Sequence, residues 1–215
     1  MANTKLENIQ LGDHLCSIYK NKEEQFSTII PFFKTGLKNN QKCIYIADEN
    51  SADEVISQLE KGGIDIKKYI ASKQFLILSK RETYLKEGSF DPDRMIDLLK
   101  ETEKGALKEG YSGLRVTGEM TWVLEQVKGS ERLIEYEAKL NDFFPDSKAT
   151  AICQYNENKF EPELLAEVIH THPFVIIYGN SYENEYYSPA EYINGAHNVF
   201  PNDSYKTIKE DIING

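Results

Sequence analysis

The sequence predicts a three-layer α/β/α fold with a mostly parallel central sheet. Two observations lead to this prediction. Short apolar runs of strand length alternate with segments of helical periodicity through most of the 215-residue chain. The runs are almost continuously apolar, which is typical of parallel strands that helices cover on both faces. The length suits one domain, and a chain of this size can bury enough apolar surface to fold without disulfides.

Six apolar runs are the predicted strands. They are His14–Tyr19, Lys42–Ala47, Gln74–Ser79, Gly113–Met120, Lys148–Tyr155 and Pro173–Gly179. Helical segments separate them, so we expect parallel strands joined by right-handed crossovers.

Residues that favour a helix N-terminus stand between these runs. They are Asn21, Ser51, Asp91 followed by Pro92, and Ser130. A further short helix is expected over Glu161–His170. Pro31 lies inside the first helix and should kink or divide it.

The sequence changes character after the sixth strand. The stretch from Ser181 to Ser204 is rich in Tyr, Asn and Pro and shows no long period, so we expect an ordered loop or flap. A short helix should follow near Tyr205–Ile213. Residues 1–200 are therefore predicted to form one domain, and residues 201–215 a short helix or tail.

Composition argues against two classes of partner. The chain has 25 basic and 35 acidic residues, a net charge of −10, which repels the phosphates of nucleic acid. No apolar run approaches the ~20 residues that span a bilayer, and the N-terminus lacks the apolar core of a secretory signal. Three cysteines are too few for a disulfide framework. We expect a cytoplasmic protein without direct nucleic-acid or membrane contacts.

The sequence lacks the motifs of common nucleotide and hydrolase sites. No phosphate-binding loop follows the first strand. The residues from Lys20 to Gln25 lack glycine and include two acidic residues. The chain has no G-x-G-x-x-G, no G-x-S-x-G, no CxxC pair and no H-E-x-x-H. We therefore expect no enzymatic activity and no cofactor.

Ligands of parallel α/β proteins bind at the carboxyl ends of the strands. Tyr19, Trp122 and Tyr155 lie at these ends and could line a small-molecule pocket, or could simply be core and rim packing. Glu119 could accept a hydrogen bond from a ligand, or it could pair with Arg115 or a lysine.

Several histidines and cysteines could form a metal site. His14 and Cys16 share one face of the first strand because strand side chains alternate. Together with Cys153 and His172 they could ligate a metal ion or sense redox state. The favoured interpretation is that the cysteines are small buried hydrophobes and that no metal binds. Glu137 is expected to form a structural ion pair or to lie on a solvated helix face.

Six stretches of sequence occur in the order that one known family shows. They are GDHLCSIY, FFKTGLKNNQKCIYIADE, LRVTGEMTWVL, IEYEAKLN, AICQYNENKF and HTHPFVIIYGNSYENEYY, which span Gly12 to Tyr187. The chain thus resembles the MEDS family, the methanogen/methylotroph sensory domain. The resemblance implies a RecA/KaiC-like fold without a Walker A loop. It also implies the sensing of small hydrocarbon derivatives, such as one-carbon, methylated or halogenated compounds.

The resemblance and the strand ends together nominate the ligand-binding residues. They are His14, Cys16, Tyr19, Glu119, Trp122, Tyr136, Glu137, Cys153, Tyr155, His172, Tyr186 and Tyr187. Where relatives often carry Asn-Pro-Tyr-Tyr, this chain has Asn184-Glu185-Tyr186-Tyr187, which puts the rigidity of that turn in doubt.

We therefore expect a non-catalytic sensory domain. A ligand at the carboxyl edge would contact Trp122, Tyr155 and the flap at Tyr186, and Glu119 and His172 would orient it. Many relatives are fused to a histidine kinase or a DNA-binding domain, so the output here should pass to a separate kinase or transcription regulator. The alternatives are a divergent RecA-like nucleotide-binding protein and a Cys/His metal or redox sensor. The oligomeric state stays open, a homodimer included.

Overall fold

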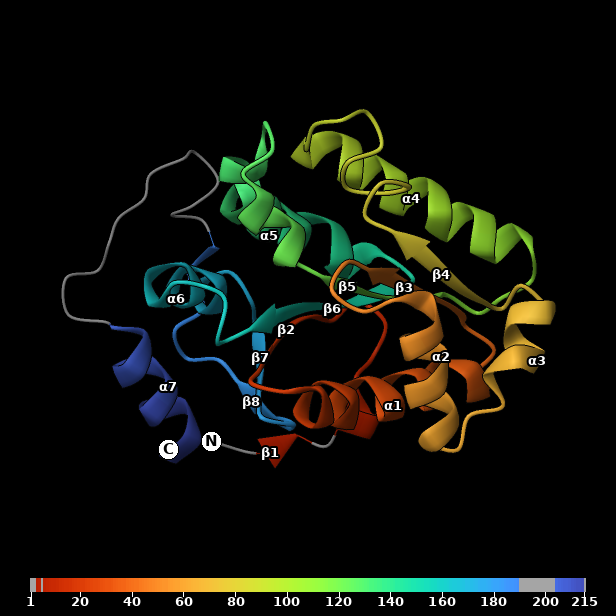
Figure 1. Cartoon of the computed structure of the whole chain (residues 1–215), viewed down its shortest axis with the longest axis horizontal. Coiled ribbons are helices and arrows are strands. Elements are labelled where there is room, and N and C mark those ends of the chain that lie inside the picture. The colour runs from red at the N-terminus through yellow and green to blue at the C-terminus, as the bar shows by residue number, and fades with distance from the viewer. Residues whose placement is uncertain (1–2, 5, 190–203, 215) are drawn as a thin grey trace.

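One mixed sheet forms the centre of the molecule. The computed structural model describes residues 3–4, 6–189 and 204–214, and eight strands in these residues make up the sheet (Figure 1). They are β1 (Asn3–Thr4), β2 (His14–Tyr19), β3 (Lys42–Ala47), β4 (Phe75–Ser79), β5 (Leu114–Glu119), β6 (Ala149–Asn156), β7 (Phe174–Ile177) and β8 (Asn180–Glu183). All six predicted strands are present, two of them with identical bounds.

The strand order is β1-β8-β7-β2-β6-β5-β3-β4. The strands from β7 to β4 in this order pair in parallel. Strand β8 pairs in the antiparallel sense with both β7 and β1. The predicted mostly parallel sheet is thus confirmed.

Helices cover both faces of the sheet. They are α1 (Lys22–Lys38), α2 (Ala52–Lys61), α3 (Ile66–Ala71), α4 (Pro92–Lys108), α5 (Leu133–Phe143), α6 (Pro162–His170) and α7 (Tyr205–Asn214). The first three pack on one face, and α4, α5 and α6 pack on the other, where α7 contacts α6 (Figure 1). Each face therefore has its own apolar core, and together the layers form the predicted α/β/α sandwich.

Three of the four predicted helix starts are real caps. The side chain of Asn21 accepts the backbone N–H of Glu24, and Ser51 forms a reciprocal capping box with Glu54. Asp91 accepts the N–H of Arg94. These contacts satisfy N–H groups that a helix leaves unpaired in its first turn. At Ser130 the chain makes a short 3₁₀ turn before α5 begins at Leu133.

Of the two outcomes expected at Pro31, a kink or a division of the first helix, the division is wrong. Helix α1 runs without a break from Lys22 to Lys38 with Pro31 inside it. Ile29, Phe32 and Phe33 on either side of the proline are fully buried against the sheet. Burial of each such side chain contributes about 1.5–3 kcal/mol, so the three together outweigh the ~3 kcal/mol cost of an interior proline.

The segment after β7 is only partly the loop that the sequence predicts. Tyr178 and Gly179 have φ values of 50° and 86°, as a two-residue hairpin turn requires, and β8 returns along β7. The expected terminal helix is present as α7. The rest of the predicted flap, residues 190–203, lies outside the described residues, and the boundary of the domain at residue 200 stays a prediction.

Candidate functional site

The structure distributes the predicted site residues over both faces of the sheet. Side chains at alternate positions of β2, β5 and β6 point to opposite faces. Cys16, Cys153 and Tyr155 lie in the core beneath α4, α5 and α6, whereas Tyr45 belongs to the core beneath α1. The predicted site residues therefore do not share one face of the sheet.

Glu119 is a fully buried carboxylate at the carboxyl end of β5, on the α1 face. Its Oε2 accepts the backbone N–H groups of Asp48, Glu49 and Asn50 at 2.7, 2.5 and 3.0 Å. Its Oε1 accepts the Tyr45 hydroxyl at 2.5 Å. Glu119 is thus an internal anion in a nest of main-chain amides, rather than a partner of Arg115 or of a lysine.

Polar side chains fill the space between Glu119 and the start of α1. Gln25 donates from Nε2 to Gln154 Oε1 at 2.7 Å and lies against the hydroxyl of Tyr19 at 3.3 Å. Asn50 donates to both Gln25 and Glu119. The sequence analysis named Tyr19 and Glu119 but missed Gln25 and Asn50. Amides in polar segments carry no signal until the fold brings them together.

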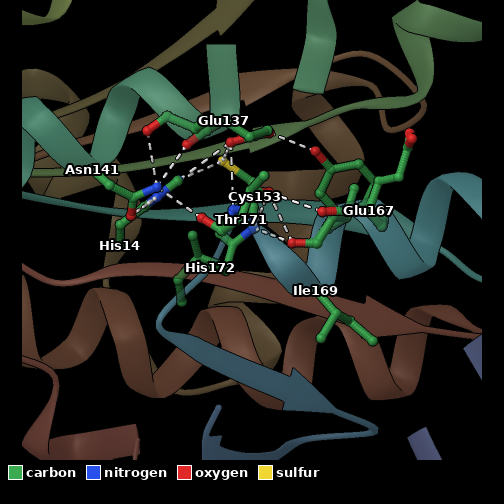
Figure 2. Close-up of polar contacts among 12 residues, drawn as sticks. His14, Glu137, Asn141, Cys153, Glu167, Ile169, Thr171 and His172 are labelled. Atoms are coloured by element: carbon green, nitrogen blue, oxygen red, sulfur yellow. Dashed lines mark hydrogen bonds and ion pairs between the residues drawn. The ribbon is translucent and has the colours of Figure 1, made fainter. Parts of the chain in front are cut away.

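A second polar cluster lies on the opposite face and toward the opposite edge. We name His14, Glu137, Cys153 and His172 the inner cluster (Figure 2). His14 begins β2, Cys153 lies within β6, Glu137 lies on α5, and His172 precedes β7. All four side chains are at least 95% buried. His14 and His172 are at the amino ends of parallel strands and Cys153 is in the middle of β6, so the inner cluster extends from the amino ends toward the middle of the sheet.

The side chains of His14, Cys153 and His172 converge on Glu137 Oε2. This oxygen lies 3.3 Å from His14 Nε2, 3.4 Å from His172 Nε2 and 3.4 Å from Cys153 Sγ. One potential ligand atom from each residue lies within 4.8 Å of all the others. The prediction that Glu137 pairs or lies on a solvated face is thus half right, because it is buried among imidazoles.

Outer contacts hold the inner cluster in place. Tyr155 donates its hydroxyl to Glu137 Oε1 at 2.5 Å. Asn141 faces His14 Nδ1 with its Oδ1 at 3.2 Å, while its amide nitrogen donates to the carbonyl of Thr171 at 2.8 Å. Asn141 follows Glu137 by one helical turn on α5, and this i, i+4 spacing was the signal that the sequence analysis did not use.

Burial controls the protonation of two members of the inner cluster. It lowers the pKa of His14 to about 4, an effect to which the charge of His172 adds. It also raises the pKa of the Cys153 thiol, and the nearby Glu137 carboxylate acts in the same direction. Both groups therefore favour their neutral forms at neutral pH.

The remaining aromatic candidates pack elsewhere. Trp122 is fully buried, stacks on Tyr84 at 5.0 Å between ring centroids and contacts Phe90 at 4.6 Å. Phe90 in turn meets the ring of Tyr136 edge-on at 5.5 Å. Within the described residues, the Trp122 indole N–H has no hydrogen-bond acceptor.

Cys16, Tyr186 and Tyr187 lie apart from these groups. Cys16 is buried beside Cys153, its register partner on the neighbouring strand, but supplies no atom to the inner cluster. Tyr186 donates its hydroxyl to Asp211 on α7 at 2.7 Å. The side chain of Tyr187 is 38% exposed.

An apolar groove lies between α4 and strands β3, β4 and β5, with a volume of about 280 Å³. We name it the α4 groove. Its apolar lining consists of Ile44, Ile46, Leu76, Leu78, Met95, Leu98, Leu99, Ala106 and Val116. Lys42 and Glu109 form an ion pair at 2.5 Å at its rim. None of the residues that the sequence analysis nominated lines it.

The chain has an α/β fold of the RecA/KaiC type. Two solved structures share this fold. The KaiC-like protein PH0186 from Pyrococcus horikoshii OT3 is 13% identical, with a TM-score of 0.56 over 78% of this chain and 72% of that one. The flagellar accessory protein FlaH from Methanocaldococcus jannaschii is 14% identical, with a TM-score of 0.56 over 79% of this chain and 72% of that one.

Residues 13–173 match the model of one family, the MEthanogen/methylotroph, DcmR Sensory domain, or MEDS. The chain belongs to the MEDS family, as its sequence motifs predict. The search of curated proteins found no match. In the described ranges, no helix combines the length and the apolar character needed to cross a membrane.

Proposed function

We propose that this chain is a non-catalytic sensory domain that binds a small hydrocarbon derivative in the α4 groove. Membership of a family of sensory domains supports the general role. The observation that carries the proposal is the groove itself, because it combines open volume with a mainly apolar lining, to which Lys42, Glu82, Thr83, Thr102 and Glu109 add polar groups. A one-carbon, methylated or halogenated compound has the matching chemistry.

The dimensions of the α4 groove favour a small guest. Its volume of about 280 Å³ falls just below the range for small-molecule sites, about 300–1,000 Å³. Aliphatic side chains from three strands and one helix favour an uncharged ligand, since burying a charge among them would cost several kcal/mol. The Lys42–Glu109 pair at the rim could orient one polar atom.

The filled carboxyl edge supports a ligand other than a nucleotide. A phosphate group requires free main-chain N–H groups or a helix N-terminus. Here Glu119 uses the amides of residues 48–50, and Asn21 caps α1 with two acids in its first turn.

The output of the domain would require a partner protein. Helix α4 forms one wall of the α4 groove and packs against α5, so a bound guest that favours one position of α4 would alter this exposed layer. We propose that a separate histidine kinase or transcription regulator recognises that change.

Gly105 offers a direct test of the α4 groove. It lies on α4 in the groove lining, and a Cβ at this position would meet no atom within 4 Å. Gly105→Leu should fill the groove, whereas Gly105→Ala should leave most of its volume. A ligand at ten times its Kd should raise the unfolding midpoint of the wild type and of Gly105→Ala by about 3 °C, and leave that of Gly105→Leu unchanged.

The measurement is a thermal shift assay with methanol, methyl thiols and halomethanes, which are uncharged at neutral pH, at millimolar concentration. Both variants replace a helical glycine, so they share the gain in helix propensity and differ in side-chain volume. Failure of every compound to shift the wild type would contradict the proposal. An equal shift in Gly105→Leu would place the ligand outside the groove.

A further inference from the structure

We propose that the inner cluster binds one divalent transition-metal ion, with zinc as the best match. The ligands would be His14 Nε2, His172 Nε2, Cys153 Sγ and Glu137 Oε2, from four separate elements of the fold (Figure 2). This inference goes beyond sensing and does not depend on it, because the inner cluster and the α4 groove share no residue.

The hydrogen bonds of both imidazoles leave the inward-facing nitrogens without protons. His172 Nδ1 lies 2.7 Å from the Val168 carbonyl, which can only accept, so Nδ1 carries the proton. Asn141 turns its amide nitrogen to carbonyl groups, so its Oδ1 accepts from His14 Nδ1. In the neutral state, each Nε2 therefore directs a lone pair into the inner cluster.

These lone pairs face a carboxylate, which is also an acceptor. The two imidazole nitrogens lie 3.3 and 3.4 Å from Glu137 Oε2. In the described part of the chain, His172 Nε2 makes no hydrogen bond. Three acceptors that converge in a buried space repel one another, and a cation at their centre would reverse that repulsion.

Four of the six separations between the donor atoms approach those of a tetrahedral site, and the other two pairs lie within 4.8 Å. Metal–nitrogen and metal–oxygen bonds of about 2.0–2.1 Å and a metal–sulfur bond of about 2.3 Å place adjacent ligand atoms about 3.3–3.6 Å apart. The measured separations are 3.3, 3.4 and 3.4 Å around Glu137 Oε2, and 3.7 Å between Cys153 Sγ and His14 Nε2. Little movement is needed to accept an ion.

Charge and outer contacts also fit. A thiolate and a carboxylate neutralise a divalent cation, so the fully buried assembly carries no net charge. Each histidine donates Nδ1–H to an oxygen, and Tyr155 donates to the second oxygen of Glu137. Outer hydrogen bonds of this kind orient the ligands of metal sites. Four protein ligands leave no open position, which is typical of a structural site.

The alternative occupant is a proton on one imidazole, which would then pair with Glu137. Metal content distinguishes the two. The full chain, purified without chelators, should contain about one equivalent of metal by mass spectrometry, as should Cys43→Ala. Cys43 is a matched control, since it is equally buried but lies on the other face of the sheet. Cys153→Ala and Glu137→Gln should each lose most of the metal.

Cobalt gives a measurement that does not depend on variants. Wild-type chain refolded with Co²⁺ should show visible ligand-field bands of a tetrahedral ion and a thiolate-to-cobalt charge-transfer band. A wild type that contains no metal and acquires no cobalt spectrum would overturn the proposal. So would a folded Cys153→Ala chain with the wild-type metal content. Neither result bears on ligand binding in the α4 groove.

Discussion

At the scale of single residues, the buried carboxylates of Glu119 and Glu137 lie on opposite faces of the sheet and have different partners. Glu119 accepts hydrogen bonds from Tyr45, from the loop at residues 48–50 and from Gln25 on α1, whereas Glu137 meets two imidazoles and a thiol. Sequence patterns selected both acids as candidates. They could not separate the roles, because the partners of each acid are distant in sequence and carry no shared motif.

Glu119 should contribute strongly to stability. Glu119→Gln places an amide N–H₂ group among donors, and it leaves the N–H groups of Asp48, Glu49 or Asn50 without an acceptor. Loss of buried charge-assisted hydrogen bonds costs about 1.5–3 kcal/mol each, so we expect the free energy of unfolding to fall by about 3 kcal/mol.

The measurement is urea denaturation followed by circular dichroism. Glu101→Gln is the control, since this exposed glutamate pairs only with Lys104 and its loss should change stability by at most about 0.5 kcal/mol. Similar stabilities for the two variants would show that Glu119 is not an internal anion of the fold.

At the scale of elements, local signals predicted most of the fold. Continuous apolar runs identified β2 to β7, and capping residues placed the starts of α1, α2 and α4. Three elements, β1, β8 and α3, were missed for physical reasons. Strand β1 has only two residues, β8 is polar at three of its four positions, and α3 spans only Ile66–Ala71, which is too short for a clear helical period.

Pro31 shows how packing overrides a local rule. The helix continues through it because buried neighbours hold α1 on the sheet. Pro31→Ala should therefore restore a main-chain hydrogen bond to Ser27 and stabilise the chain by about 1–3 kcal/mol. An increase in the midpoint of urea denaturation would confirm this account, and an unchanged or lower midpoint would contradict it.

At the scale of the whole molecule, the chain combines a RecA/KaiC-like sheet with a buried polar cluster on each of its faces. The sequence predicted the family, the sheet and the missing phosphate loop. It did not predict the α4 groove, because a cavity depends on how α4 is seated against three strands. The inner cluster unites residues 14, 137, 153 and 172, and only the strand order brings them together.

The central claim is that the domain binds a small apolar guest and no nucleotide. Trp122 is the sole tryptophan and stacks on Tyr84, which follows the groove residue Thr83 in the chain. A fluorescence titration of the wild type is therefore the most direct test. We predict that at least one methylated or halogenated compound changes the Trp122 emission with a saturable profile, and that Mg·ATP does not. A saturable response to Mg·ATP alone would contradict the account.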